Sequence, residues 1–225
     1  MKLITTLFLI TSTALCGFAQ HIIGIEASYK RSTFVYDEAS GSPFESAGRI
    51  GIGLNYQAYI GEILSSATHV STGIIYESKG AARLSTLLDE NGSAVRDEKV
   101  HSVLYYWTLP LMIELHPSSG SFFVEAGGFY SLFTEHYFSE IPLARYQSIE
   151  SGFKSMTPYQ PLLYKSYDAG INIGVGTAIP MSDRTGVKFT FRYSHGLVDV
   201  NDDIAYTGAL YNRSFSISVA FDWGI

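Results

Sequence analysis

The sequence has one cysteine, Cys16, and few charged residues. A single cysteine forms neither an internal disulfide nor a cysteine-rich zinc site, which excludes both kinds of stapled small domain. Only 16% of the 225 residues are charged, against about 25% in an average soluble domain. The formal net charge of −6 gives no general attraction for nucleic acid. No apolar run reaches the ~18 residues of a transmembrane helix.

Apolar, aromatic and glycine residues are abundant instead. The chain is 46% apolar and 14% aromatic, and it contains 21 glycines. Intrinsic disorder needs low hydrophobicity and high net charge, so this composition argues against it. The length allows one domain with a substantial interior, or the wall of one barrel.

Residues 1–19 have the pattern of a secretory signal peptide, which leaves 20–225 as the mature domain. A basic start is followed by an uncharged apolar run over 3–15 and by small residues up to Ala19. The run is too short to span a bilayer as a helix. A leucine precedes Cys16, where a lipoprotein signal favours a small residue. We therefore predict an exported mature chain without cysteine, either a soluble secreted protein or an outer-membrane barrel.

Apolar residues recur with a period of two along the mature chain. In residues 49–60, Ile50, Ile52 and Leu54 alternate with glycine and asparagine. Successive side chains of a strand point to opposite faces, so this alternation indicates strands with one apolar face. Applied throughout, it predicts eight strands, at residues 22–30, 49–60, 69–79, 100–116, 121–135, 164–179, 186–196 and 211–223.

The links between these strands alternate in length. Short links over residues 61–68, 117–120 and 180–185 alternate with long ones over 31–48, 80–99, 136–163 and 197–210. Outer-membrane barrels have this arrangement, with an even strand number, tight periplasmic turns and long outer loops. We predict an all-β fold: an eight-stranded antiparallel transmembrane β-barrel with an up-and-down meander.

The composition of the two strand faces favours the membrane barrel over a soluble one. The apolar face would meet lipid, and the other face, rich in glycine and serine, would line a narrow lumen. A water-facing surface would carry many more lysines and glutamates. Aromatic residues near the strand ends suit the two membrane interfaces: Tyr29, Tyr56, Tyr76, Tyr105, Trp107, Tyr130, Tyr193 and Trp223.

Single charges interrupt the polar face. They are Glu26, Glu77, Glu114, Glu125, Asp168, Lys188 and Arg192. Buried charges need partners, because an unpaired ion is costly to desolvate. We predict that the last five form a lumen charge network that fills the barrel and fixes its register. A selective narrow pore or gate, and a catalytic site, remain the alternatives.

Four segments together resemble the PorT-like outer-membrane β-barrel family of Bacteroidetes. They are residues 106–111 (YWTLPL), 122–127 (FFVEAG), 168–176 (DAGINIGVG) and 192–197 (RYSHGL). The resemblance implies a small barrel in the outer membrane of a Gram-negative bacterium. For some relatives it also implies a part in type IX secretion or gliding machinery.

Two features depart from the usual pattern of such barrels. The chain ends on Ile225, whereas barrels commonly end on an aromatic residue. Pro110 lies inside a strand paired on both sides, where it removes one hydrogen bond from the ladder. We expect a β-bulge at this proline.

Other candidate sites in the sequence are weak. Ser194 and His195, with Glu114 or Glu125, suggest a Ser–His–acid set that deacylates lipid A, but adjacent strand residues point to opposite faces. The acidic tip at 199–203 lacks the turn glycine of a calcium loop. The six histidines show no pair two residues apart, so we propose no metal site and no cofactor.

We therefore predict a non-enzymatic outer-membrane barrel that is a structural or accessory component of the cell envelope. The alternatives are a narrow pore or ligand-binding barrel and, third, a lipid A-modifying enzyme. The expected partners are outer-membrane lipid and envelope proteins that bind the outer loops, since the link at 138–163 is rich in aromatic residues. No nucleic-acid partner is expected, and the oligomeric state stays open.

Overall fold

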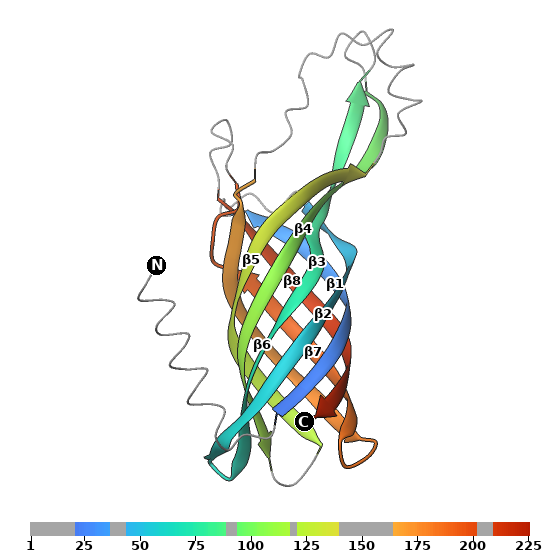
Figure 1. Ribbon diagram of the computed structural model, residues 1–225. Helices are drawn as coiled ribbons and strands as arrows, with labels where there is room; N and C mark the ends of the chain where they lie inside the picture. The colour runs from blue at the N-terminus through green and yellow to red at the C-terminus, as the bar shows by residue number, and fades with distance from the viewer. Residues whose placement is uncertain (1–20, 37–43, 89–93, 118–120, 140–163, 202–208) are drawn as a thin grey trace.

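The computed structural model is a closed barrel of antiparallel strands (Figure 1). It describes residues 21–36, 44–88, 94–117, 121–139, 164–201 and 209–225, and the structural statements below concern these residues. The predicted signal peptide at 1–19 lies outside them. So does most of the aromatic loop at 138–163.

Eight strands follow one another around the barrel, and β1 closes the ring by pairing with β8. They are β1 (His21–Tyr36), β2 (Phe44–Ile63), β3 (Ser66–Leu88), β4 (Ala94–Pro117), β5 (Phe122–Ser139), β6 (Tyr167–Pro180), β7 (Thr185–Gly196) and β8 (Leu210–Gly224). The predicted fold, strand number and strand order are confirmed.

No helix in the described part of the chain is long and apolar enough to cross a membrane.

The strands run further into the long links than the sequence predicted. The strand expected at 69–79 extends to Leu88, and the strand expected at 100–116 begins at Ala94. Strands β3, β4 and β5 consequently rise beyond the rim of the barrel (Figure 1). Backbone pairing does not require an apolar face, so the ladder continues where the hydrophobic alternation has ended.

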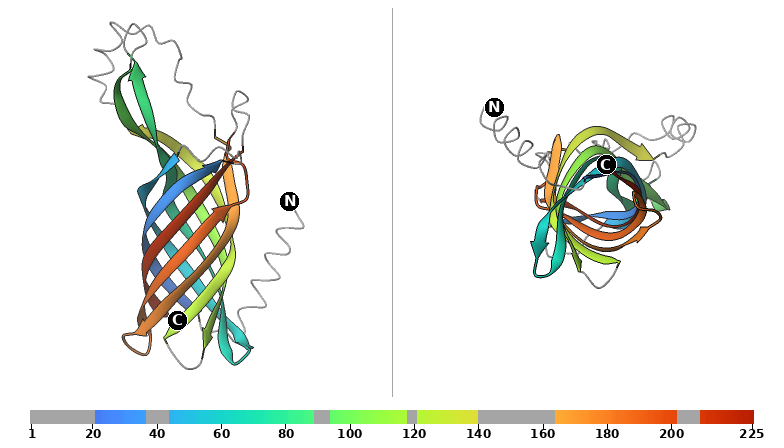
Figure 2. Two further views of the ribbon diagram at one scale, coloured as in Figure 1. Left: turned by 180° about the vertical axis from the view of Figure 1, so that it is seen from behind. Right: turned by 60° about the horizontal axis from the view of Figure 1, so that its bottom comes forward.

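The opposite end of the barrel has tight turns and also the C-terminus (Figure 2). The β2–β3 turn consists of Leu64 and Ser65 alone, with φ angles of 51° and 61°. Two central residues with positive φ define a type I′ hairpin turn. We call this the turn end, and the other the loop end.

The two faces of each strand differ as predicted. Apolar side chains cover the outside: Ile50 is 72% exposed, and Ile52 and Leu54 of the same strand are also exposed. Small, polar and charged side chains point inward and are buried, among them four serines of β8 and β1. The alternation therefore separates a lipid-facing belt from a polar lumen.

The bulge expected at Pro110 is wrong. The register of β3 with β4 is the same on both sides of the proline, because Thr72 pairs with Leu111 and Ile75 pairs with Thr108. The hydroxyl of Thr72 donates a hydrogen bond of 2.8 Å to the carbonyl of Pro110. The strand therefore passes through the proline without an inserted residue.

Candidate functional site

The five predicted lumen charges all lie inside the barrel. Glu114, Glu125 and Asp168 are at most 2% exposed, Lys188 is 6% exposed, and the side chain of Arg192 is 12% exposed. They do not form one continuous network. Glu114 and Glu125 each pair with one predicted cation, whereas Asp168 pairs with a lysine that the prediction left out.

Glu114 and Lys188 form the first pair, across the lumen near the turn end. The ammonium of Lys188 lies 3.1 Å from Oε1 of Glu114. The amide of Gln57 donates to both carboxylate oxygens, at 2.7 and 2.6 Å. His116 adds a contact of 3.2 Å to Oε2. Glu114 is thus saturated with hydrogen bonds, as a buried carboxylate requires.

Arg192 and Glu125 form the second pair with a bidentate geometry. Nε of Arg192 donates to Oε1 of Glu125 at 2.5 Å, and Nη2 donates to Oε2 at 3.2 Å. Nη1 lies 3.7 Å from Glu26. The planar guanidinium holds two acids of different strands, which fixes their relative position.

Glycines of β6 leave room for these inward-facing side chains. A Cβ at Gly174 would lie 2.6 Å from Oε1 of Glu125, and a Cβ at Gly176 would lie 2.2 Å from the ring of Phe123. Backbone oxygens of β7 would lie 2.9 Å and 2.5 Å from the same two Cβ atoms, so the close approach of both neighbouring strands favours glycine on the inner face of β6.

A second cluster of charged side chains lies toward the loop end, and in it Glu77 and Lys79 each contact two groups of opposite charge. Glu77 contacts the ammonium of Lys30 and lies 3.5 Å from that of Lys79. Lys79 in turn lies 2.9 Å from Asp168 and donates to Ser131 at 2.9 Å.

Neutral side chains complete the same cluster. Thr108 donates to Glu77 at 2.8 Å, and Asn212 donates to Asp168 at 3.0 Å. The cluster thus joins side chains of six strands: β1, β3, β4, β5, β6 and β8. We call this set the loop-end cluster: Lys30, Glu77, Lys79, Thr108, Ser131, Asp168 and Asn212.

The sequence prediction left out Lys30 and Lys79, although the signal was present. Lys30 follows Glu26 by four residues and Lys79 follows Glu77 by two, so each shares the inward face of its strand. Both lysines are the last residues of their predicted strands. Arg49 is also buried and was omitted; it donates to backbone carbonyls of Gly48, Lys79 and Ser102.

Large apolar side chains also point into the lumen, which the prediction of a small, polar inner face did not anticipate. Phe123, Phe129, Tyr106, Met112 and Ile75 are all at most 7% exposed. The ammonium of Lys79 lies 4.2 Å from the ring centroid of Phe129, and that of Lys188 lies 5.3 Å from Phe123. Cation–π contacts of this kind help to hold lysines in a desolvated interior.

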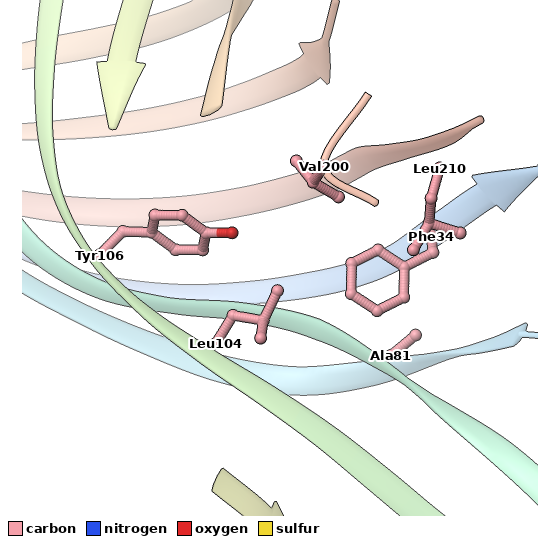
Figure 3. Packing of buried hydrophobic residues seen from close by; sticks show 6 residues of the cluster. All are labelled: Phe34, Ala81, Leu104, Tyr106, Val200 and Leu210. Atoms are coloured by element: carbon pink, nitrogen blue, oxygen red, sulfur yellow. The ribbon is translucent and has the colours of Figure 1, made fainter. Parts of the chain in front are cut away.

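An apolar cluster lies beyond the loop-end cluster, toward the barrel mouth. Val200, from the β7–β8 link, packs with strand residues inside the barrel mouth (Figure 3). Backbone hydrogen bonds hold it there, from Val200 N to the carbonyl of Leu210 at 2.8 Å and from Lys165 N to the carbonyl of Val200 at 3.0 Å. We call this set the apolar cap: Phe34, Ala81, Leu104, Tyr106, Val200 and Leu210.

Asp199, the first residue of the acidic tip that we considered as a calcium site, has a structural role. Oδ1 of Asp199 accepts hydrogen bonds from the backbone N–H groups of Asn201 and Leu210, at 3.0 and 2.7 Å. Asp202 and Asp203 lie outside the described residues.

Two histidines come together across β3 and β4, which a search for pairs along one strand misses. The ring centroids of His69 and His116 are 4.7 Å apart. Within the described ranges, no group of three or more histidine, cysteine, aspartate or glutamate side chains is arranged to hold a metal ion.

Ser194 and His195 lie on opposite faces of β7, as their adjacency predicts. The ring of His195 stacks on that of Tyr193, two residues away, with 6.3 Å between centroids. Tyr193 and His195 therefore share one face, and Ser194 lies on the other with Arg192. The geometry does not bring serine and histidine into the hydrogen-bonded pair that a nucleophile needs.

Solved structures with similar folds are outer-membrane and surface proteins. OprG of Pseudomonas aeruginosa matches with a TM-score of 0.51 and 12% identity over 92% of this chain and 96% of that one. Neisserial surface protein A matches with a TM-score of 0.43 and 10% identity over 89% of this chain and 95% of that one. None of the curated proteins compared with this chain matches it.

The family comparison covers most of the chain. The family model described as outer membrane protein beta-barrel domain matches residues 18–202. This range includes strands β1 to β7 and every predicted lumen charge. The similarity to OprG agrees with it at the level of fold. The chain therefore belongs to the outer membrane protein β-barrel domain family, and its place is the outer membrane.

Proposed function

We propose that this protein is a non-enzymatic, non-conducting barrel that acts as a structural or accessory component of the cell envelope. The observation that carries the proposal is the filling of the lumen. The two turn-end ion pairs, the loop-end cluster and the apolar cap follow one another along it. An ion crossing this interior would have to break several buried salt bridges and displace packed side chains.

Its more specific role, in this proposal, is with the type IX secretion or gliding machinery of Bacteroidetes. The support is the resemblance to PorT-like proteins in four segments, which include Glu125, Asp168 and Arg192 of the lumen. A closed barrel acts through its surfaces, and long loops on a rigid scaffold are common binding elements. Partner proteins would therefore contact the outer loops.

Conductance tests the closed lumen. The mature chain, residues 20–225, would be refolded and inserted into planar bilayers, and single-channel current would be recorded. We expect no steady current, because the turn-end ion pairs, the loop-end cluster and the apolar cap all lie along the path. A steady current through the unaltered chain would refute the proposal in favour of a narrow pore.

Crosslinking in cells tests the accessory role. Crosslinked envelopes would be solubilised, the protein purified, and its attached chains identified by mass spectrometry. We expect secretion or gliding components, and we expect the deletion strain to lose secretion or gliding. Normal secretion and gliding in that strain would refute this assignment.

Lipid analysis tests the absence of lipid A-modifying activity. The acyl pattern of lipid A would be measured by mass spectrometry in cells with and without the protein. We expect identical patterns, since Ser194 and His195 point to opposite faces. A missing acyl chain that depends on the protein would make it an enzyme.

A further inference from the structure

Three basic side chains lie together on the outside of the barrel at the loop end. His195 of β7 pairs directly with Arg213 of β8, Arg213 pairs with Thr33 of β1, and Arg31 pairs with Phe215. Directly opposed residues of neighbouring strands have Cβ atoms about 5 Å apart, and diagonal neighbours are about 7–8 Å apart. Arg31 is the diagonal neighbour of Arg213. Arg213, on the middle strand of the three, therefore neighbours both His195 and Arg31.

These side chains point toward lipid and not into the lumen. Arg213 alternates with inward-facing Asn212 and Ser214, and it shares its face with Phe215, which is 50% exposed. Arg31 likewise shares its face with Tyr29, which is 55% exposed. Both aromatic residues are two positions closer to the barrel centre than the arginines. The arginines thus lie just beyond an aromatic girdle, at the depth where acyl chains give way to headgroups.

Polar atoms of this cluster lack hydrogen-bond partners within the described part of the chain. Nε of Arg213 and Nδ1 of His195 are buried but have no hydrogen-bond partner in the described part of the chain. Nη2 of Arg31 donates to Ser46 at 2.8 Å, which orients the guanidinium and leaves its other N–H groups available. Among the described residues, no ion pair joins Arg31 or Arg213 to a carboxylate.

We propose that Arg31, His195 and Arg213 form a binding site for the phosphate headgroup of an anionic lipid in the outer leaflet. A guanidinium matches a phosphate with two parallel N–H donors, and two guanidiniums beside an imidazole supply several such donors at one point. The cluster carries at least two positive charges, so it needs a counterion in a partly desolvated position. The exposed aromatic and aliphatic residues directly below it would contact the acyl chains of the same lipid. A lipid with a phosphate headgroup fits both the basic cluster and the apolar surface below it, whereas a free phosphate fits only the basic cluster.

Thermal unfolding in neutral detergent micelles tests this site. The mature chain would be unfolded with added lipid A that carries its phosphates, with the same glycolipid after removal of the phosphates, and with inorganic phosphate. We expect the phosphorylated lipid to raise the Tm by several degrees, as a ligand that binds only the folded state does. The dephosphorylated lipid and inorganic phosphate should have little effect.

Two sets of variants assign the effect to the cluster. The double variant Arg31→Gln and Arg213→Gln should lose most of the Tm shift, and the double lysine variant should retain part of it because the charge remains. Arg184→Gln is the matched control, since Arg184 is an exposed arginine in the β6–β7 turn at the other end. Because the shift is measured within each variant, a change in basal stability does not affect the comparison.

Three outcomes would overturn the proposal. The first is an equal Tm shift in the glutamine double variant. The second is an equal shift with the dephosphorylated lipid, which would mean acyl-chain contact alone. The third is an equal shift with inorganic phosphate, which would mean a free-anion site and no lipid.

Discussion

The two ends of the lumen hold their charges in different ways. At the turn end, Lys188 forms a salt bridge with Glu114, its only one among the described residues, and Arg192 contacts Glu125 closely and Glu26 at a longer distance. At the loop end, Glu77 is shared by two lysines, and one of these also binds Asp168. By direct contact, the turn end thus consists of two separate charge groups, and the loop end of one connected cluster.

This difference matters because connected charges do not respond independently. In a separate pair, removal of one partner leaves one uncompensated charge, and removal of both leaves none. In a shared cluster, the loss of one acid affects every cation that contacts it, and the residual charges rearrange together. We expect the loop end to be the more sensitive of the two.

Glu77→Ala should cause the largest loss of stability. The change removes the carboxylate that Lys30 contacts and one of the two that Lys79 contacts. Breaking a buried ion pair by removing one partner costs about 3–5 kcal/mol. Urea unfolding of the refolded mature chain in micelles, followed by tryptophan fluorescence, measures the free energy of unfolding.

Glu62→Ala is the matched control for that prediction. Glu62 is exposed near the β2–β3 turn, so its loss should change the free energy of unfolding by no more than about 0.5 kcal/mol. A loss below about 1 kcal/mol for Glu77→Ala would contradict the shared cluster.

Glu114→Gln should have the next largest effect, and a second substitution should relieve it. The single change leaves the Lys188 ammonium without its carboxylate and should cost about 2–3 kcal/mol. The double variant with Lys188→Met removes both charges and should be more stable than the single variant. A double-mutant cycle from the same urea curves gives the coupling, which should be at least about 1 kcal/mol. Additive losses would show that Glu114 and Lys188 contribute to stability independently of each other, which would contradict the ion pair.

The sequence predicted the turn end of the lumen more completely than the loop end. Strand number, order and facing follow from local alternation and link length, and these were confirmed. Glu114, Glu125, Lys188 and Arg192 lie at least two residues inside their predicted strands, so the period of two predicted that they face inward. Their pairing across the lumen was not local information and came only with the structure.

The loop end was harder to predict for two physical reasons. The predicted strands ended at Lys30 and Lys79, because hydrophobic alternation stops there while backbone pairing continues. Val200 belongs to a link, and nothing in its local sequence indicates that it folds back into the barrel mouth. Both features depend on contacts between distant parts of the chain.

Gly176→Ala tests how tightly the turn end is packed. A Cβ at this position would lie 2.2 Å from the Phe123 ring, which stacks on His116 with 5.0 Å between centroids. Overpacking of this kind costs about 1–3 kcal/mol. Gly128→Ala on the neighbouring strand is the control, because its only close contact would be 3.4 Å from the carbonyl oxygen of Gly170. A Cβ at Gly176 would also lie 2.5 Å from the backbone oxygen of Phe189, so equal stabilities of the two variants in urea would mean that both the ring and this strand move aside freely.

The smallest expected effect is a gain in stability, from Leu64→Asn combined with Ser65→Gly in the β2–β3 turn. Both residues have positive φ, where Asn-Gly is the preferred pair and a leucine is strained. Leu64 is also 92% exposed, so its replacement removes little packing. We expect the free energy of unfolding in micelles to rise by about 0.5–1 kcal/mol.

The same variant tests whether the two ends are independent. The turn is remote from the loop-end cluster, so its gain should add to the loss of Glu77→Ala within about 0.5 kcal/mol. A gain that disappears in the Glu77→Ala background would mean that the loop-end cluster governs the whole barrel. The turn-end charge groups and the loop-end cluster would then be separate in their contacts, but not in their contributions to the free energy of unfolding.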